Sequence, residues 1–143
     1  MINEKAQSLS GYRLEKAKSL LTQSELLLTN RQYDGSINRS YYAIFNAVRS
    51  VLALLSVDSR SHQGVMVYFD RYFVKTGIFD KQFSKILHTA FDTRQDNDYE
   101  DFNVPSETDA KEQYSNATLF IEEIERKRES FIEGKISLPA IIQ

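Results

Sequence analysis

The sequence predicts an all-α fold, an antiparallel up-and-down bundle of four to five helices. Apolar residues recur at intervals of three and four along most of the chain, which is the period of an amphipathic helix. Strict two-residue alternation bounded by turn residues, the pattern typical of strands, is not found. The five glycines and two prolines stand where helices are expected to end. We therefore expect a single helical domain over residues 1–134 and a C-terminal tail over residues 135–143.

The first two helices are predicted over about residues 4–29 and 35–55, with Asp34 as the N-cap of the second. The first turns a stripe of apolar residues inward, namely Leu14, Ala17, Leu21 and Leu28. The second has the clearest pattern, with apolar residues gathered on one face: Ile37, Tyr41, Ile44, Phe45, Val48, Val51, Leu52 and Leu55. A stripe of this width is typical of a helix that faces a core.

Three further helices are predicted, from about Ser61 to Gly77, from after Asp80, and from a Ser106 cap to about residue 133. Their aromatic and aliphatic residues again follow the helical period. The tail contains four apolar residues, Ile136, Leu138, Ile141 and Ile142. It is expected to dock on the bundle, to dock on a partner, or to be a frayed end.

Composition excludes several classes of function. Cysteine is absent, which excludes disulfides, thiolate zinc sites and a cysteine nucleophile. The net charge of −2 argues against a broad surface for duplex DNA. No apolar run is long enough to span a membrane, and the first 18 residues do not resemble a signal peptide, so we expect a cytoplasmic protein. His62 and His88 lack partners at metal-ligand spacing, and no glycine-rich phosphate loop occurs, so neither a metal nor a cofactor is predicted.

Arg94 is the first residue that does not suit a simple core. It continues the inward series of Phe83, Leu87 and Ala90 at spacings of three and four. A guanidinium on an apolar stripe must reach water, pair with an acid or bind an anion, because a buried unpaired charge is costly. One interpretation is an ion pair with Asp98 within the same helix, worth only tenths of a kcal/mol. The other is a ligand site.

A second feature is one edge of the core-facing stripe of the second predicted helix. Asn38, Tyr42 and Arg49 lie together along it. An amide, an aromatic ring and a cation would suit a base and a phosphate. The alternative interpretation is the ordinary boundary of an amphipathic helix, with the Tyr42 hydroxyl reaching water.

Several segments together resemble the small prokaryotic HEPN-domain proteins, over about residues 9–128. They occur in the same order as in that family: Tyr12–Ala17, Asp34–Arg39, Arg39–Phe45, Ser61–Val65, Phe73–Gly77 and Arg94–Tyr99. The resemblance implies a four- or five-helix bundle that commonly forms a homodimer. It also implies a metal-independent RNase, whose Arg-(four to six residues)-His motifs meet across the dimer, and a toxin with a nucleotidyltransferase antitoxin as partner.

The sequence departs from that motif. A histidine is expected at position 99, 100 or 101 after Arg94, and those positions hold tyrosine, glutamate and aspartate. The chain resembles instead a branch with an Arg-x3-Asp-Tyr pattern, so Arg94, Asp98 and Tyr99 are the catalytic candidates. The candidates for binding a ligand are Asn38, Arg39, Tyr42, Arg49 and His62.

Three hypotheses follow. The first is a homodimer that binds a nucleotide or RNA in one polar cleft, within a toxin–antitoxin or defence module. The second is an active endoribonuclease that uses Arg94 with Asp98 or Tyr99. The third is a non-enzymatic helical adaptor whose apolar tail recruits another protein.

Overall fold

The computed structural model describes residues 2–99 and 105–141, and of residues 96–99 it describes the backbone alone. Its elements are helices throughout, in this order: α1 (Glu4–Thr29), α2 (Tyr33–Leu54), α3 (His62–Phe69), a π-helical turn η1 (Asp70–Val74), α4 (Lys81–Tyr99) and α5 (Glu107–Ile132). The predicted all-α bundle is confirmed. Within the described ranges, no helix combines the length and the apolar character that a membrane span requires.

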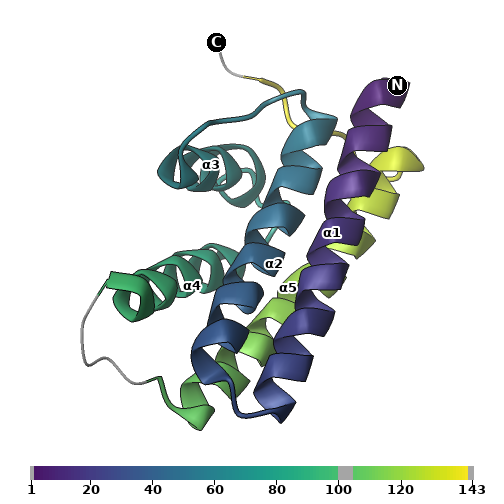
Figure 1. The fold of residues 1–143 in the computed structure, drawn as a ribbon. Helices are drawn as coiled ribbons and strands as arrows, with labels where there is room; N and C mark the ends of the chain where they lie inside the picture. Colours follow the sequence, from purple (N-terminus) through teal and green to yellow (C-terminus); the bar gives the residue numbers. More distant parts are fainter. Residues whose placement is uncertain (1, 100–104, 142–143) are drawn as a thin grey trace.

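Helix α2 lies at the centre of the bundle. Helix α1 packs along one side of it, whereas α3 and α4 lie on the other side, and α5 runs behind α1 and α2 (Figure 1). Helix α2 contacts each of the other four helices. A side chain on α2 can therefore meet groups from α3 and α4, two elements that are distant from it in sequence.

The core forms around the apolar stripe of α2, as predicted. All eight residues of that stripe are buried. They pack against aromatic rings from the other helices, among them Phe69, Phe73, Phe79, Phe83 and Phe120. A single core of this kind supplies most of the stability of a domain of this length.

The inward stripe of α1 differs from the prediction. Leu14 and Ala17 are buried as expected, but Leu21 and Leu28 are only partly buried. The buried face continues through serines instead. The Ser24 hydroxyl lies 2.9 Å from the Ser36 carbonyl oxygen and 2.7 Å from the Ser40 hydroxyl. Small side chains let α1 and α2 approach closely, and the hydrogen bonds satisfy hydroxyls that burial would otherwise penalise.

The start of α2 also differs from the prediction. The N-cap is Gln32, and Asp34 lies inside the first turn, where a carboxylate still interacts favourably with the helix dipole. The proposed cap at Asp34 is therefore wrong by two residues. The preceding helix ends in two hydrogen bonds of the Schellman type, from Gln32 to the Leu27 carbonyl and from Arg31 to the Leu28 carbonyl. This ending makes the connection short and brings Gln32 directly to the start of α2.

The third predicted helix is divided into two parts. Helix α3 begins after the Ser61 cap, whose hydroxyl accepts a 2.9 Å hydrogen bond from the Gly64 amide. It then continues as the π-helical turn η1, which sequence periodicity alone did not indicate. The chain leaves this turn at Gly77, where φ is +81°, a conformation that favours glycine.

The connection between α2 and α3 is turned back by a second Schellman ending. Amides of Ser56 and Val57 donate to the carbonyls of Ala53 and Leu52, and Ser56 adopts a φ of +56°. This reversal folds residues 57–61 back beside the end of α2. It sets Asp58 next to arginines of α1 and α2, which become part of the candidate site.

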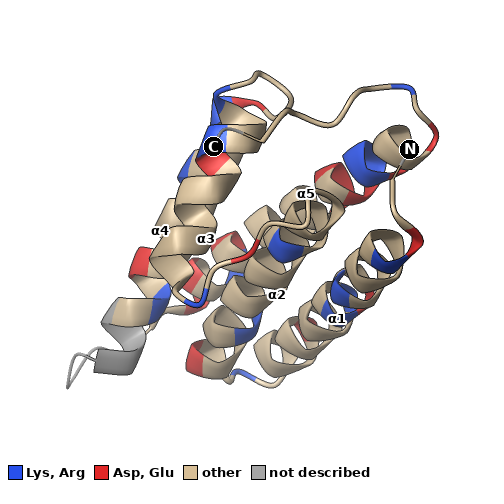
Figure 2. Cartoon of the chain, turned by 90° about the horizontal axis from the view of Figure 1, so that it is seen from above, with Lys and Arg blue, Asp and Glu red and all other residues tan. Residues whose placement is uncertain are grey.

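The C-terminal helix agrees closely with its prediction. The Ser106 hydroxyl accepts a 3.0 Å hydrogen bond from the Asp109 amide at its start, and Gly134 follows its end with a φ of +73°. In the tail, Ile136 and Leu138 pack against the core, while Ile141 is exposed. Positive and negative side chains are interspersed over the bundle (Figure 2), consistent with the small net charge.

Candidate functional site

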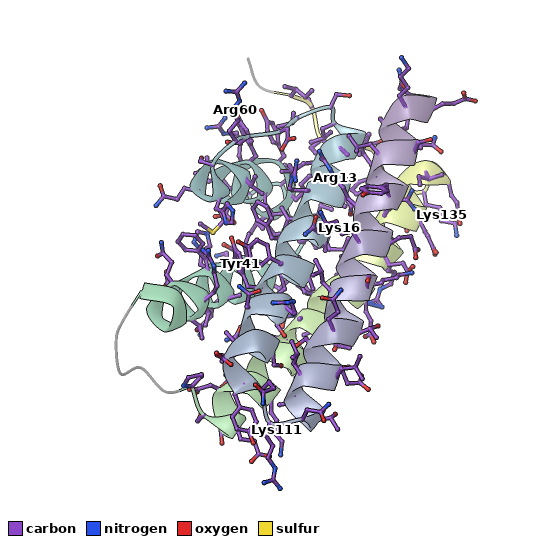
Figure 3. All side chains as sticks on the ribbon, viewed as in Figure 1. Arg13, Lys16, Tyr41, Arg60, Lys111 and Lys135 are labelled. Atoms are coloured by element: carbon purple, nitrogen blue, oxygen red, sulfur yellow. The ribbon has the colours of Figure 1, made fainter. Side chains whose placement is uncertain are left out.

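Arg94 meets two tyrosines of the central helix. Its guanidinium carbon lies 5.4 Å from the centre of the Tyr41 ring and 5.5 Å from that of Tyr42. Both distances are within the range of a cation–π interaction. The inward position predicted for Arg94 on α4 thus places its charge over the aromatic edge of α2, and Figure 3 shows Tyr41 on the side of α2 that faces α3 and α4.

His62 completes this cluster from a third element. It is the first residue of α3, and its Nδ1 lies 2.5 Å from the Tyr41 hydroxyl. Its ring stacks on Phe45 with centroids 4.3 Å apart and stands edge-on to Tyr42 at 5.9 Å. The hydrogen bond and the stacked ring together restrict the imidazole to one orientation. An imidazole held in this way is suited to directed hydrogen bonding or proton transfer.

The protonation states around His62 follow from burial and charge. Burial raises the pKa of Tyr41, so its hydroxyl stays protonated and can donate to Nδ1. A neutral imidazole that accepts at Nδ1 carries its proton on Nε2. Burial lowers the pKa of His62, and the charges of Arg94 and Arg49 lower it further. His62 is therefore neutral at pH 7, with Nε2 as its donor.

A triad of charged residues lies at the other end of the cluster. The Asp58 carboxylate accepts hydrogen bonds from Arg49 at 2.9 Å and from Arg13 at 3.2 Å. Arg13 reaches from α1 toward α2 (Figure 3) and also donates to the Arg49 carbonyl at 3.1 Å. Burial favours the neutral acid, but the hydrogen bond from Arg49 and the two positive charges prevail and lower the pKa of Asp58. The Asp58 carboxylate is therefore ionised and pairs with two arginines.

An open pocket lies beside this triad. It has a volume of about 580 Å³ and is lined by Phe45, Arg49, Asp58, Ser59, Arg60 and His62. We call it the Arg49 pocket. Guanidinium groups bind phosphate oxygens in a bidentate manner, and ring faces provide a platform for stacking a base. The pocket therefore combines the two kinds of contact that a nucleotide requires.

A continuous series of contacts joins the pocket to Arg94. Arg94 lies over Tyr42, Tyr42 is edge-on to His62, His62 stacks on Phe45, and Phe45 lies 5.9 Å from the Arg49 guanidinium carbon. We call these five residues the His62 surface. Tyr42, Arg49, His62 and Arg94 are each partly exposed, so a ligand can touch all four. The surface carries a cation at each end and aromatic rings between.

The structure separates two predicted ligand residues from this surface. The Arg39 guanidinium is turned toward α1, where Nε donates to the Gln23 side chain at 3.2 Å. Its Nη1 donates to the Asn38 side chain at 2.9 Å. The side chains of Asp98 and Tyr99, the other two catalytic candidates, lie outside the described residues, although the α4 backbone extends to Tyr99.

Sequence reasoning missed other members of the site. Tyr41 was assigned only to the core, because its position on the apolar stripe does not show where its hydroxyl points. Asp58 and Arg60 lie in a loop that carries no periodic signal. For Arg13 the sequence offers one sign, because Arg13 directly precedes Leu14 of the predicted inward stripe. The structure shows that its side chain is only 11% exposed. In the described part of the chain, His, Asp and Glu residues form no group of three that could hold a metal ion.

Comparisons with known proteins agree with this architecture. A family model described as the HEPN domain matches residues 10–127. A UPF0332 protein of Thermotoga maritima is 32% identical over 125 residues, covering 87% of this chain and 94% of that protein. A Methanocaldococcus jannaschii protein named "Putative toxin" is 28% identical over 125 residues, covering 87% and 90% respectively.

A third relative is more similar over a shorter length. A UPF0332 protein of Pyrococcus horikoshii is 37% identical over 75 residues, which are 52% of this chain and 53% of that protein. The family model covers α2, α3 and α4 completely and most of α1 and α5. The chain belongs to the HEPN-domain family.

Proposed function

We propose that this protein binds a nucleotide or single-stranded RNA on the His62 surface, as a component of a toxin–antitoxin or defence module. The observation that carries the proposal is the sequence of contacts from Arg94 through Tyr42, His62 and Phe45 to Arg49. Cations at the two ends of a row of aromatic rings suit a strand of phosphates and bases. Arg60 and the Arg49 pocket add positive charge and space at one end.

The spacing of the two cations favours a ligand with more than one phosphate. Arg94 contacts Tyr42, and Arg49 lies seven residues beyond Tyr42 on the same helix. At about 1.5 Å per residue, this separation is about 10 Å along the helix axis. A single phosphate group cannot reach both guanidinium groups at that separation. A short RNA strand is therefore expected to bind more tightly than a mononucleotide.

Two further parts of the proposal concern assembly. We propose a homodimer, as the family resemblance implies, and a nucleotidyltransferase antitoxin as the protein partner. The name of the Methanocaldococcus jannaschii relative supports a toxin-like role. Sedimentation of the purified chain tests the dimer. The gene neighbourhood tests the partner, since a nucleotidyltransferase encoded beside this chain is expected.

Binding is tested by the fluorescence anisotropy of a 5′-labelled oligouridylate. We expect Arg94→Gln and Arg49→Gln each to weaken binding at least several-fold. The logarithm of affinity should fall linearly with the logarithm of salt concentration, and each loss of a phosphate contact should reduce that slope by about 0.7.

The matched control is Arg126→Gln, which removes an equal charge from an exposed ion pair with Glu123 on α5. It should leave both affinity and slope nearly unchanged. If all three substitutions weakened RNA binding equally, binding would result from general charge attraction, and a specific site on the His62 surface would be contradicted. A wild-type protein with no affinity for RNA or nucleotides would contradict the proposed function itself and favour the adaptor hypothesis.

A further inference from the structure

We propose that His62 is a catalytic residue, which accepts the proton of a ribose 2′-hydroxyl when an RNA strand lies across the His62 surface. This inference rests on the proposed RNA binding and adds a reaction to it. The histidine expected after Arg94 is absent from positions 99–101. Here α3 supplies a different histidine, and it joins Arg94 within a single protomer.

The orientation of the ring is the first argument. Nδ1 faces the Tyr41 hydroxyl at 2.5 Å, toward the core, and one ring face is covered by Phe45. Nε2 lies on the opposite side of an imidazole from Cγ and is not engaged by the same hydroxyl. The His62 side chain lines the Arg49 pocket. A ligand in that pocket can therefore approach Nε2 while Tyr41 holds the ring.

The charges around the ring are the second argument. Helix α2 contributes Tyr41, Tyr42 and Arg49, and α4 contributes Arg94. The preceding loop contributes Asp58 and Arg60 to the shared pocket. Burial and the charges of Arg94 and Arg49 lower the pKa of His62 and keep the imidazole neutral, the form that a general base requires. Successive phosphates bound to the two arginines offset their charges, so the imidazolium becomes easier to form when a substrate is present.

The reaction is an internal transesterification. The 2′-hydroxyl proton moves to Nε2 of His62, the 2′-oxygen forms a bond to the adjacent phosphorus, and the bond from phosphorus to the 5′-oxygen breaks. Because Nε2 carries the proton in the neutral form described above, the imidazole must first convert to the tautomer with its proton on Nδ1, in which Nδ1 donates to the Tyr41 hydroxyl oxygen and Nε2 can accept. The leaving 5′-oxygen takes a proton from water, and His62 later returns its own to solvent. The products are a 2′,3′-cyclic phosphate and a 5′-hydroxyl.

The arginines Arg94 and Arg49 stabilise charge and do not transfer protons in this reaction. Negative charge grows on the phosphate oxygens as the 2′-oxygen attacks, and a guanidinium close to those oxygens stabilises it. Tyr41 is a positioning residue, since it contacts His62 and not the substrate. Its hydroxyl can donate to neutral Nδ1 or accept from the protonated ring, which lets it follow the change in protonation.

The test uses the full chain with a labelled oligouridylate and an all-deoxy strand of the same length, in EDTA to suppress contaminating metal-dependent nucleases. We expect the ribose strand to be cleaved to 2′,3′-cyclic phosphate ends and the deoxy strand to stay intact. At saturating RNA, His62→Gln should lower the cleavage rate at least about 100-fold, within the range for loss of a general base and a far larger factor than its loss of RNA affinity. His88→Gln is the matched control, because His88 pairs with Asp70 away from this surface.

The pH profile gives a second measurement that does not depend on a variant folding. The wild-type cleavage rate should rise with pH and level off above the pKa of His62, and Tyr41→Phe should shift this profile. RNA that binds to the wild-type protein and stays intact would overturn the catalytic proposal and leave the binding site standing. Equal cleavage by the wild-type protein and folded His62→Gln would also overturn it. Absence of RNA binding would instead overturn the proposed function.

Discussion

The hydroxyl of Tyr41 lies 2.5 Å from Nδ1 of His62, and their rings stack with centroids 5.6 Å apart at an interplanar angle of 18°. The two residues are 21 positions apart, on α2 and α3. Tyr41 is fully buried, whereas His62 is partly exposed. The contact therefore ties an exposed imidazole to the rigid centre of the core.

Removal of that hydroxyl should loosen the imidazole and little else. Tyr41→Phe keeps the buried ring but leaves Nδ1 without its donor. We expect the free energy of unfolding to fall by about 1 kcal/mol, the net value of one hydrogen bond. The ¹⁵N shifts of neutral His62 should show the proton on Nε2 in the wild type and a mixture of tautomers in the variant. An Nδ1 proton in the wild type would contradict the assigned donor.

The protonation of His62 should depend on the two arginines. Its pKa is expected below the ordinary value of about 6.5, and both Arg94→Gln and Arg49→Gln should raise it, because each removes a positive charge. NMR titration of the ring measures this directly. Arg126→Gln serves as the control and should leave the pKa unchanged.

The same shift makes stability depend on pH. The unfolded chain binds a proton at His62 near pH 6.5, whereas the folded chain binds it only at a lower pH. The contribution of neutral His62 to the free energy of unfolding is therefore fully present above about pH 6.5. It is lost as the pH falls through the pKa of His62 in the folded chain. The free energy of unfolding measured with urea should decrease on acidification across that interval, and the decrease should be smaller in His62→Gln. A free energy of unfolding that increases on acidification in the wild type, but not in His62→Gln, would contradict the lowered pKa.

Asp58 should compete with an anionic ligand. It accepts hydrogen bonds from Arg13 and Arg49, so Asp58→Asn removes the negative charge that pairs with both guanidinium groups while it keeps the side-chain size. We expect RNA affinity to rise severalfold and the free energy of unfolding to fall by no more than about 1 kcal/mol for each partly exposed pair. Glu133→Gln, which breaks an exposed pair with Lys135, controls for net charge. An equal gain in affinity from both variants would dismiss a specific role for Asp58.

Gly64 should be required for the loop that precedes His62. A Cβ at this position would lie 2.0 Å from Ser59 Oγ and 2.8 Å from Ser59 Cβ, so the loop would have to move. Gly64→Ala gains about 0.5–1 kcal/mol of helix stability, but overpacking costs about 1–3 kcal/mol, so a net loss is expected. Thermal unfolding and RNA affinity measure the two effects. The double variant with Ser59→Gly should recover most of both, and failure to do so would refute this steric account.

The positions of the helices and the face of α2 that enters the core could be predicted from the sequence. Both depend on the local period of apolar residues, and local spacing is what a sequence displays directly. The same period placed Arg94 on an inward position of α4. The resemblance to the HEPN-domain proteins, confirmed by the family match, likewise depended on the order of short segments along the chain.

Which of those side chains contact one another depends on how the helices pack. The stripe of serines on α1 is buried because their hydroxyls find partners on α2, a pairing that hydrophobic periodicity cannot reveal. Asp58 joins Arg49 because a left-handed Ser56 turns the loop back. His62 joins Arg94 because α3 and α4 pack on the same side of α2. Contacts between distant segments depend on helix packing and loop geometry, and these are set by the whole chain.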